Sequence, residues 1–156
     1  MPEVRYLKAV NQALYDAMEA DDTVFVIGED VAAAGGPFKA TRGLLETFGP
    51  GRVYDAPIAE AVITGVAVGA AMTGMRPVAE IMFMDFITLA MDQIVNQAAK
   101  ARSMFGGQAS LPLVIRAPHG GGLSAGPQHS QCLEAWFAHV PGLKVIAPWS
   151  AADAKG

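Results

Sequence analysis

The chain has 156 residues, of which 52% are hydrophobic and 17% charged, and its formal net charge at pH 7 is -4. This length suffices for one domain with a substantial core. The charged fraction is below the roughly 25% of an average chain, so part of the surface is expected to be covered by something else. The negative net charge and the lack of a run of like charges exclude a typical nucleic-acid-binding face.

The sequence predicts no membrane span. The apolar run over residues 61–75 is 15 residues long, whereas a spanning helix needs about 20. Residues 1–6 have neither an apolar signal core nor an Arg-rich transit pattern. Cys132 is the only cysteine, so a disulfide framework and a metal-type cysteine pair are excluded. We interpret Cys132 as a buried, inert thiol with no base beside it.

Helices and strands are expected to alternate along the chain. Leu7, Val10, Leu14 and Met18 recur at helical spacing and predict a helix over Tyr6–Ala20. The other patterns predict strands at 23–27, 52–54, 77–83, 111–116 and 143–147, and helices at 41–48, 57–74, 86–104 and 131–139. Strands that are apolar on both faces and alternate with helices predict an α/β fold, a parallel sheet with helices on both faces.

The end of the chain has the pattern of a helix start. Ser150 is followed three residues later by Asp153, in the capping-box position. The sequence stops at Gly156, before such a helix has made two turns. We therefore expect the chain to be one domain of a longer protein or a truncated piece of it.

Glu60 is the most informative residue of the sequence. It begins a run of apolar and small residues, and no Lys or Arg follows it between Ala61 and Met75. A buried carboxylate is costly unless it is paired or hydrogen-bonded. Glu60 therefore requires a partner from elsewhere: a backbone cap, a second chain or a ligand nitrogen.

Gly65 and Gly69 lie one turn apart in the same predicted helix, in a row with Ala61 and Thr73. Small residues at this spacing allow another backbone to approach closely. Two interpretations stay open, an ordinary tight contact between the helix and the sheet, and a contact with a partner subunit.

Two further segments are candidates for a binding site. The stretch from Met82 to Phe86 ends a predicted strand with aromatic residues, and ligands of open parallel sheets bind beyond the carboxyl ends of the strands. His129 follows a Gly-rich stretch and is flanked by Gln and Ser, which suits proton transfer or anion binding. Simple core packing and a surface histidine are the alternative interpretations. His119 and His139 are assigned no role.

The Gly-rich segments do not form a recognisable phosphate site. Neither a Gly-x-Gly-x-x-Gly pattern nor a Walker-type lysine motif is present, and no metal-binding motif appears.

Over nearly its whole length the sequence resembles the β subunit of thiamine-diphosphate-dependent 2-oxo acid dehydrogenases, the family of pyruvate dehydrogenase, acetoin dehydrogenase and the branched-chain enzyme. The matching segments, in order, are Gly28-Glu-Asp, Asp55-Ala-Pro-Ile-Ala-Glu60, Val68-Gly-Ala-Ala71, Arg76-Pro77, Asp92-Gln-Ile-Val-Asn-Gln-Ala-Ala-Lys100, Gln128-His-Ser-Gln131, Pro141-Gly-Leu-Lys-Val145 and Asp153-Ala-Lys-Gly156.

The resemblance implies that residues 1–156 form the pyrimidine-binding domain, with the thiamine-diphosphate-binding fold. The C-terminal transketolase-like domain of such a subunit is absent from this sequence. Magnesium and the cofactor diphosphate belong to the partner α subunit in this family, so no metal ligand is expected in this chain. The implied partners are that α subunit, a second β subunit and a lipoyl acyltransferase core.

The resemblance also implies roles for individual residues. Glu60 matches the glutamate that hydrogen-bonds N1′ of the cofactor aminopyrimidine, and Phe86 matches the aromatic residue that stacks on that ring. His129 matches the histidine near the substrate and the incoming lipoyl group. The complete set of implied cofactor contacts is Glu29, Ile58, Glu60, Met82 and Phe86, and the implied catalytic residues are Glu60 and His129.

The expected reaction is oxidative decarboxylation of a 2-oxo acid with acyl transfer to a lipoyl carrier. Pyruvate is the first candidate substrate, with acetoin or a branched-chain 2-oxo acid next. The chain alone is expected to be inactive. The expected location of the protein is the cytoplasm in a bacterium or the mitochondrial matrix in a eukaryote. The alternatives are a non-catalytic assembly module and a fragment of a transketolase-like or deoxyxylulose-phosphate synthase enzyme.

Overall fold

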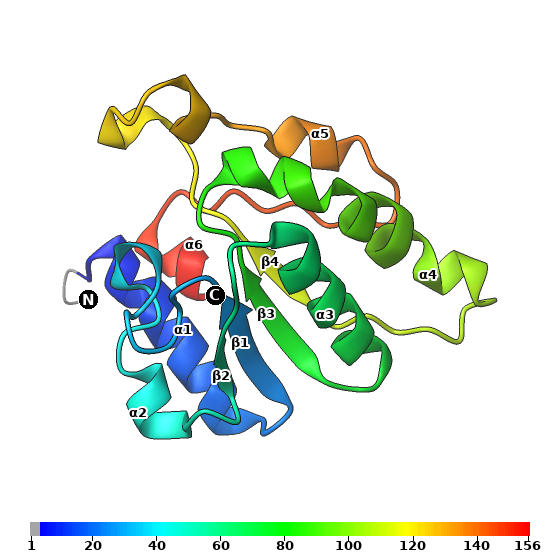
Figure 1. Cartoon of the computed structure of the whole chain (residues 1–156), viewed down its shortest axis with the longest axis horizontal. Coiled ribbons are helices and arrows are strands. Elements are labelled where there is room, and N and C mark those ends of the chain that lie inside the picture. The colour runs from blue at the N-terminus through cyan, green and yellow to red at the C-terminus, as the bar shows by residue number, and fades with distance from the viewer. Residues whose placement is uncertain (1–3) are drawn as a thin grey trace.

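The computed structural model describes residues 4–156; residues 1–3, part of the segment considered above for targeting, lie outside it. The chain forms a four-stranded parallel sheet of order β2-β1-β3-β4 with helices on both faces, as predicted (Figure 1). The elements are α1 (Tyr6–Ala20), β1 (Val24–Gly28), η1 (Pro37–Lys39), α2 (Leu44–Phe48), β2 (Val53–Asp55), α3 (Glu60–Met72), β3 (Arg76–Glu80), η2 (Met84–Ala90), η3 (Asp92–Ala98), α4 (Ala99–Met104), β4 (Val114–Arg116), η4 (Gly121–Leu123), η5 (Pro127–His129), α5 (Glu134–Ala138) and α6 (Ala151–Lys155).

The sheet has an apolar core on each face because successive strand residues point to opposite sides. In β1, Val24 and Val26 pack with α1 and α2, whereas Phe25 and Ile27 pack with α3 and η2. All five residues of β1 are buried. This two-sided burial explains why the central strand reads as a continuous apolar run.

Arg52 links the end of α1 to β1 through hydrogen bonds. Its guanidinium donates hydrogen bonds to the carbonyl oxygens of Val24 at 2.6 Å, Met18 at 2.9 Å and Asp21 at 2.8 Å. One side chain thus satisfies carbonyl groups at the end of α1, in the following turn and in β1.

The C-terminal helix α6 returns to α1. Its first turn has the predicted capping box: the Asp153 N–H donates to Ser150 Oγ at 3.1 Å, and the Ser150 N–H donates to the Asp153 carboxylate at 2.9 Å. Lys155 pairs with Asp16 of α1 at 2.8 Å. The capping-box prediction is therefore confirmed.

Several predicted boundaries shift. The helix expected at 57–74 begins at Glu60, and Gly74, with φ +99°, follows its end. The helix expected at 41–48 begins at Leu44, because the Thr41 hydroxyl donates to the Val31 carbonyl at 2.6 Å rather than capping a helix. The segment expected as one helix at 86–104 is helical but changes type along its length. It is a 3-10 helix in η2, a π-helix in η3 and an α-helix in α4. The helix expected at 131–139 is shortened to α5.

The strand predicted at 143–147 is wrong. In the described part of the chain these residues pair with no strand, and Ile146 is 79% exposed. The neighbouring edge strand β4 pairs over only three residues, all with β3. An apolar segment needs a partner strand to satisfy its backbone groups as a ladder, and here it has none.

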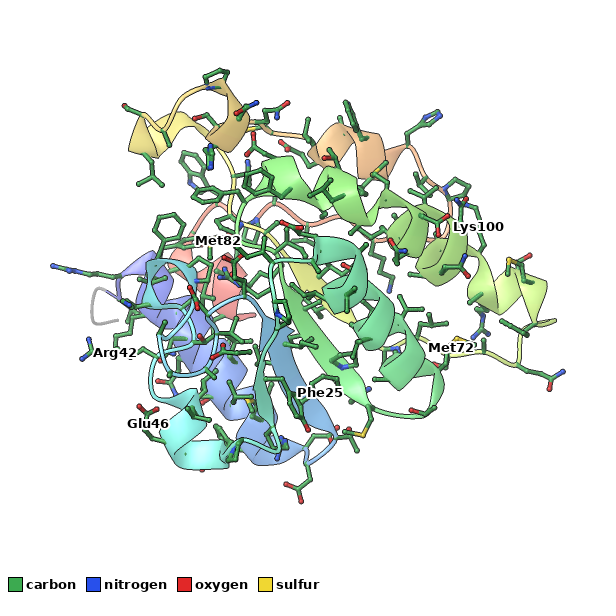
Figure 2. All side chains as sticks on the ribbon, in the orientation of Figure 1. Phe25, Arg42, Glu46, Met72, Met82 and Lys100 are labelled. Atoms are coloured by element: carbon green, nitrogen blue, oxygen red, sulfur yellow. The ribbon has the colours of Figure 1, made fainter. Side chains whose placement is uncertain are left out.

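The strand order reverses at β1, and this reversal lies at the edge formed by the carboxyl ends of the strands. The chain passes from β1 to β2 on one side and then crosses to β3 on the other side of β1. Ligands of open α/β sheets bind outside the carboxyl ends of the strands at such a reversal. In Figure 2, Met82 lies at this edge and Phe25 lies toward the opposite one. Within residues 4–156, the helices are too short or too polar to cross a membrane.

Candidate functional site

The end of β1 and the end of β3 lie unusually close at the candidate site. Gly28 is in register with Glu80, and a Cβ added to Gly28 would come within 2.7 Å of the Glu80 carbonyl oxygen. The Ala56 N–H donates to the Gly28 carbonyl at 2.8 Å and ties in the segment that leads to α3. Three chain segments thereby arrive at one edge.

Glu60 is the first residue of α3 and is only 7% exposed. At this position the helix dipole favours a negative charge. No side-chain hydrogen bond caps the start of α3, and none of the side-chain hydrogen bonds and ion pairs within residues 4–156 involves the Glu60 carboxylate. The sequence left three partners open for Glu60: a backbone cap, a second chain or a ligand nitrogen. Residues 4–156 supply no cap, so a second chain and a ligand nitrogen remain.

Glu29 lies close enough to Glu60 for the two charges to interact. Burial raises the pKa of Glu29 above its ordinary value, and the negative charges of Asp30 and Glu60 raise it further. Like charges nearby disfavour the charged form of a carboxyl group, in the same direction as burial does. The two predicted acids are therefore brought together at the end of β1.

The predicted Phe86 and His129 are also brought together, in a group of aromatic rings. The His129 imidazole lies edge to face with Phe86, at 5.2 Å between centroids, and with Phe83, at 5.0 Å. Phe38 approaches Phe83 at 6.1 Å. We name Phe38, Phe83, Phe86 and His129 the aromatic cluster.

Phe83 and Phe38 were not among the predicted site residues. Phe83 belongs to the aromatic strand end that the sequence analysis noted, so its position was a usable signal. Phe38 has a left-handed backbone, φ 54°, as does Lys39, φ 67°. This conformation is costly for residues other than glycine and clusters at functional sites, but the sequence gives no sign of it.

The two apolar residues of the prediction lie in different surroundings. Met82 is half-buried at the end of the strand, whereas Ile58 is 76% exposed two residues before Glu60. A large exposed apolar side chain next to a buried acid leaves apolar surface that a ligand ring or a partner can cover.

Asp85 anchors the segment that carries His129, a function that was not predicted from the sequence. The Gln131 side chain donates to Asp85 Oδ1 at 2.8 Å, and the Gln131 N–H does so at 3.3 Å. Burial raises the pKa of Asp85, but these hydrogen bonds and others from the nearby backbone outweigh burial, so the net shift of the pKa is downward. In the sequence, only its position next to Phe86 could have drawn attention to Asp85.

Glu80 and Arg116 form an ion pair at the ends of β3 and β4, with the carboxylate buried. The Arg116 guanidinium donates two hydrogen bonds of 2.6 Å to the Glu80 carboxylate, which is 1% exposed. Burial raises the pKa of Glu80, and the charge and hydrogen bonds of Arg116 oppose that rise. A fork-shaped pair of this kind fixes the ends of β3 and β4 relative to each other.

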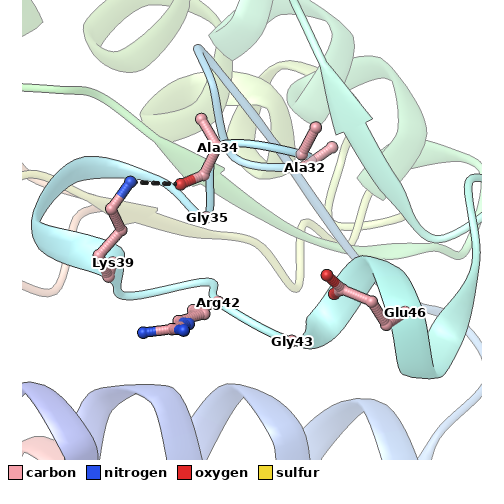
Figure 3. A pocket seen from close by; sticks show the side chains of 8 residues that line it. Ala32, Ala34, Gly35, Lys39, Arg42, Gly43 and Glu46 are labelled. Carbon is pink, nitrogen blue, oxygen red and sulfur yellow. Dashed lines mark hydrogen bonds between the residues drawn. The ribbon is translucent and has the colours of Figure 1, made fainter.

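A separate hollow of about 350 Å³ lies beside α2 (Figure 3). Its lining includes Arg42, Glu46 and Lys39, whose ammonium group donates to the Ala34 carbonyl at 2.7 Å. None of the predicted site residues lines this hollow. We assign the candidate site to the strand ends because the acidic and aromatic groups converge there.

The interpretation of Cys132 was wrong. Its side chain is exposed, and a base does lie beside it, since His119 Nδ1 is 3.1 Å from its sulfur atom. The two residues belong to separate parts of a loop region, so their contact depends on the path of the chain and not on any spacing in the sequence.

The strand order and the helices on both faces define an α/β domain of the doubly covered parallel type, with acids and aromatic rings gathered at the strand ends as a candidate site. Residues 2–156 match the family model of the transketolase pyrimidine binding domain, so the chain belongs to this family. This result confirms the predicted fold class, and the family is one of thiamine-diphosphate-dependent proteins.

Sequence relatives confirm the resemblance to β subunits. The chain is 52% identical to the 2-oxoisovalerate dehydrogenase subunit beta of Bacillus subtilis, covering 100% of this chain and 48% of that protein. It is 51% identical to the mitochondrial pyruvate dehydrogenase E1 component subunit beta-2 of Oryza sativa, covering 99% of this chain and 41% of that protein. The chain therefore spans less than half the length of these relatives.

A solved structure supports the fold independently. A split gene transketolase, described as an inactive beta4 tetramer, matches 96% of this chain and 45% of its own with a TM-score of 0.75. Its sequence identity is 24%, so this likeness concerns the fold alone.

The residues at the strand ends fit the pyrimidine part of thiamine diphosphate. The buried Glu60 carboxylate, which has no side-chain partner within residues 4–156, can accept a hydrogen bond from a ring N–H. The aromatic cluster together with Ile58 offers apolar surface for a flat ring.

Proposed function

We propose that this chain is the pyrimidine-binding half of the active site in the β subunit of a 2-oxo acid dehydrogenase. The reaction is oxidative decarboxylation with acyl transfer to a lipoyl carrier. Pyruvate is the first candidate substrate, and branched-chain 2-oxo acids and acetoin follow. The names of the two relatives, a pyruvate and a 2-oxoisovalerate enzyme, support this range.

The observation that carries the proposal is the Glu60 carboxylate. It is buried at the start of α3, at the edge where β1 and β3 end, and no group of residues 4–156 neutralises it. A structural role would be served better by an apolar residue or a paired acid. A buried carboxylate without a partner from these residues is suited to hold a proton on a bound ring nitrogen.

The residues divide the work at the bound cofactor. Thiamine diphosphate supplies the carbon nucleophile and the electron sink for decarboxylation. Glu60 holds the proton at the pyrimidine ring nitrogen, and Glu29, whose own pKa is raised, supports it from the end of β1. Phe86, Met82 and Ile58 form the apolar seat of the ring.

His129 acts on the substrate side. Its ring contacts Phe83 and Phe86 edge to face, and its loop is anchored to Asp85 through Gln131. An imidazole fixed in this manner can orient the 2-oxo acid and donate or accept a proton during acyl transfer.

An apolar stripe on α3 supports a subunit interface. Val62, Val66 and Met72 are exposed on the face that also contains Gly69, and nothing lies within 4 Å of a Cβ added to Gly69. Gly65 instead faces Gln93 of this chain at an ordinary 3.6 Å. The row of small residues thus makes an internal contact at Gly65 and leaves an open face at Gly69. We propose that this open face contacts the α subunit or a second β subunit.

The remaining parts of the proposal concern the complete enzyme. Magnesium and the diphosphate are held by the α subunit, and a C-terminal domain and a lipoyl acyltransferase core complete the assembly. The chain alone turns over no substrate. The compartment is the cytoplasm in a bacterium or the mitochondrial matrix in a eukaryote, in line with the mitochondrial name of the rice relative.

The test is Glu60→Gln in the complete β subunit assembled with its α subunit. Gln keeps the size of the side chain and removes the charge, so subunit assembly should persist while thiamine-dependent decarboxylation falls by about a hundredfold or more. The matched control is Glu46→Gln, an exposed glutamate of α2. Sedimentation measures assembly, and the rate with an artificial electron acceptor measures decarboxylation.

Retained activity in Glu60→Gln would refute the assigned role. An assembly module would bind its partner subunits but show no thiamine-dependent turnover even in the wild type. A transketolase-like enzyme would transfer ketol groups between sugar phosphates without a lipoyl acceptor.

A further inference from the structure

Three metal-ligating side chains converge at the base of the loop that carries His129. His119 Nδ1 is 3.1 Å from Cys132 Sγ, and a carboxylate oxygen of Glu134 completes a group whose ligand atoms all lie within 4.8 Å of one another. These residues precede and follow residues 120–131, so the group closes the loop at its two ends.

The backbone on both sides of the group is fixed. The Met84 N–H donates to the Pro118 carbonyl at 2.9 Å, next to His119. The Gln131 side chain is bound to Asp85, next to Cys132, and the following Leu133 is buried in the core. The ligand side chains therefore start from positions that the fold sets in advance, which lowers the cost of ordering them.

Glu134 gives an independent indication of a cation site. Its Oε2 atom is buried and has no hydrogen-bond partner among the described residues. Leaving a buried carboxylate oxygen without a partner is costly. A cation bound by the Glu134 carboxylate would reduce this cost.

We propose that His119, Cys132 and Glu134 bind a thiophilic divalent transition-metal ion of the Zn²⁺ class. Thiolate and imidazole ligands select such ions, whereas Mg²⁺ takes oxygen ligands. Binding forms the metal–sulfur, metal–nitrogen and metal–oxygen bonds, and the thiol proton leaves to solvent. Three protein ligands leave a fourth tetrahedral position for water.

The geometry needs little adjustment. In a tetrahedral Zn²⁺ site the bond lengths place a nitrogen and a sulfur ligand about 3.6 Å apart. The present contact is 3.1 Å, and both side chains are exposed, so they can separate by this amount without disturbing the core. A bound ion would join the two ends of the loop and restrict the motion of His129.

The experiment uses Co²⁺ as a spectroscopic probe, added to the purified protein in the assembly in which it occurs. The wild type should take up one Co²⁺ per chain with a sulfur-to-cobalt charge-transfer band, and Zn²⁺ should displace it. Cys132→Ser should abolish the band, and His119→Asn should weaken binding by about a hundredfold. The control is His139→Asn, since His139 is also exposed and should leave binding unchanged.

Alkylation of Cys132 by iodoacetamide gives a second measurement that needs no variant. Zn²⁺ should slow the modification of this thiol at least tenfold, and a chelator should restore the rate. The proposal is overturned if the wild type shows no charge-transfer band, if the band persists in Cys132→Ser, if His119→Asn and His139→Asn behave alike, or if Zn²⁺ leaves the alkylation rate unchanged.

Discussion

The His129 imidazole and the Phe86 ring meet edge to face, with centroids 5.2 Å apart and planes at 84°. One ring comes from η2, directly after β3, and the other from the loop region beyond β4. Contacts of this kind contribute about 0.5–1.5 kcal/mol beyond apolar burial. They link the part of the site assigned to the cofactor ring with the part assigned to the substrate.

The first prediction concerns His129. In the assembled enzyme, His129→Gln should lower the rate of acyl transfer to the lipoyl carrier by about a hundredfold, because a positioned proton donor is lost. Transfer is measured as reductive acylation of a lipoyl domain. His139→Gln is the matched control, and equal rates for the two variants would contradict the role of His129.

A second prediction concerns the approach of β1 to β3. Gly28→Ala should lower the free energy of unfolding by about 1–3 kcal/mol, because its new Cβ would meet the Glu80 carbonyl oxygen at 2.7 Å. Gly51→Ala is the control, since nothing lies within 4 Å of a Cβ there. Urea unfolding of both variants measures the difference, and equal stabilities would show that the strand ends can move apart.

Asp85 should give the protein a distinct pH dependence. Its folded-state pKa lies below the ordinary value of 3.8, so the unfolded chain binds the proton more tightly. The stability that the carboxylate contributes is therefore present above pH 3.8 and is lost as the pH falls through the folded-state pKa. Asp85→Asn should be less stable than the wild type near neutrality, and the two stabilities should converge in acid.

Urea unfolding between pH 7 and pH 3 would measure this convergence. Asp92→Asn serves as the control because Asp92 is exposed and, within residues 4–156, its carboxylate accepts a side-chain hydrogen bond only from the nearby Asn96 amide. A constant difference between Asp85→Asn and the wild type at every pH would refute the proposed linkage.

The exposed face of α3 gives the last prediction. Gly69→Leu should leave the fold of the chain intact, because the space beside Gly69 is open, but should weaken association with the partner subunit by about tenfold or more. Co-purification with the α subunit and sedimentation measure this association. Ala17→Leu, at an exposed position of α1, should associate normally, and normal association of Gly69→Leu would move the interface elsewhere.

Local pattern was sufficient to predict much of the fold. The strands buried on both faces read as apolar runs, and the capping box needed only Ser150 and Asp153. The segment 143–147 was mistaken for a strand because its apolar residues satisfy the same pattern, whereas pairing depends on a neighbour that no local pattern reveals.

The candidate site was predictable in part. Glu60 was conspicuous because an acid in an apolar helix calls for a partner, and the strand end drew attention to Phe86. The contact of Phe38 with Phe83 depends on a left-handed backbone, and the contacts of His119 with Cys132 and of Asp85 with Gln131 depend on the path of loops. Such contacts join residues distant in the sequence and leave no periodic trace.

The parallel pairing of β1 with β3 has a consequence for folding kinetics. It joins Val24 to Arg76 and Gly28 to Glu80, so the whole intervening segment must be looped out before the pair forms. Non-local pairing of this kind is slow because chain entropy is lost before burial compensates for it. The candidate site lies at the end of this same pair. We therefore expect α1 to gain protection in pulsed hydrogen exchange before β3 does, with the site forming last.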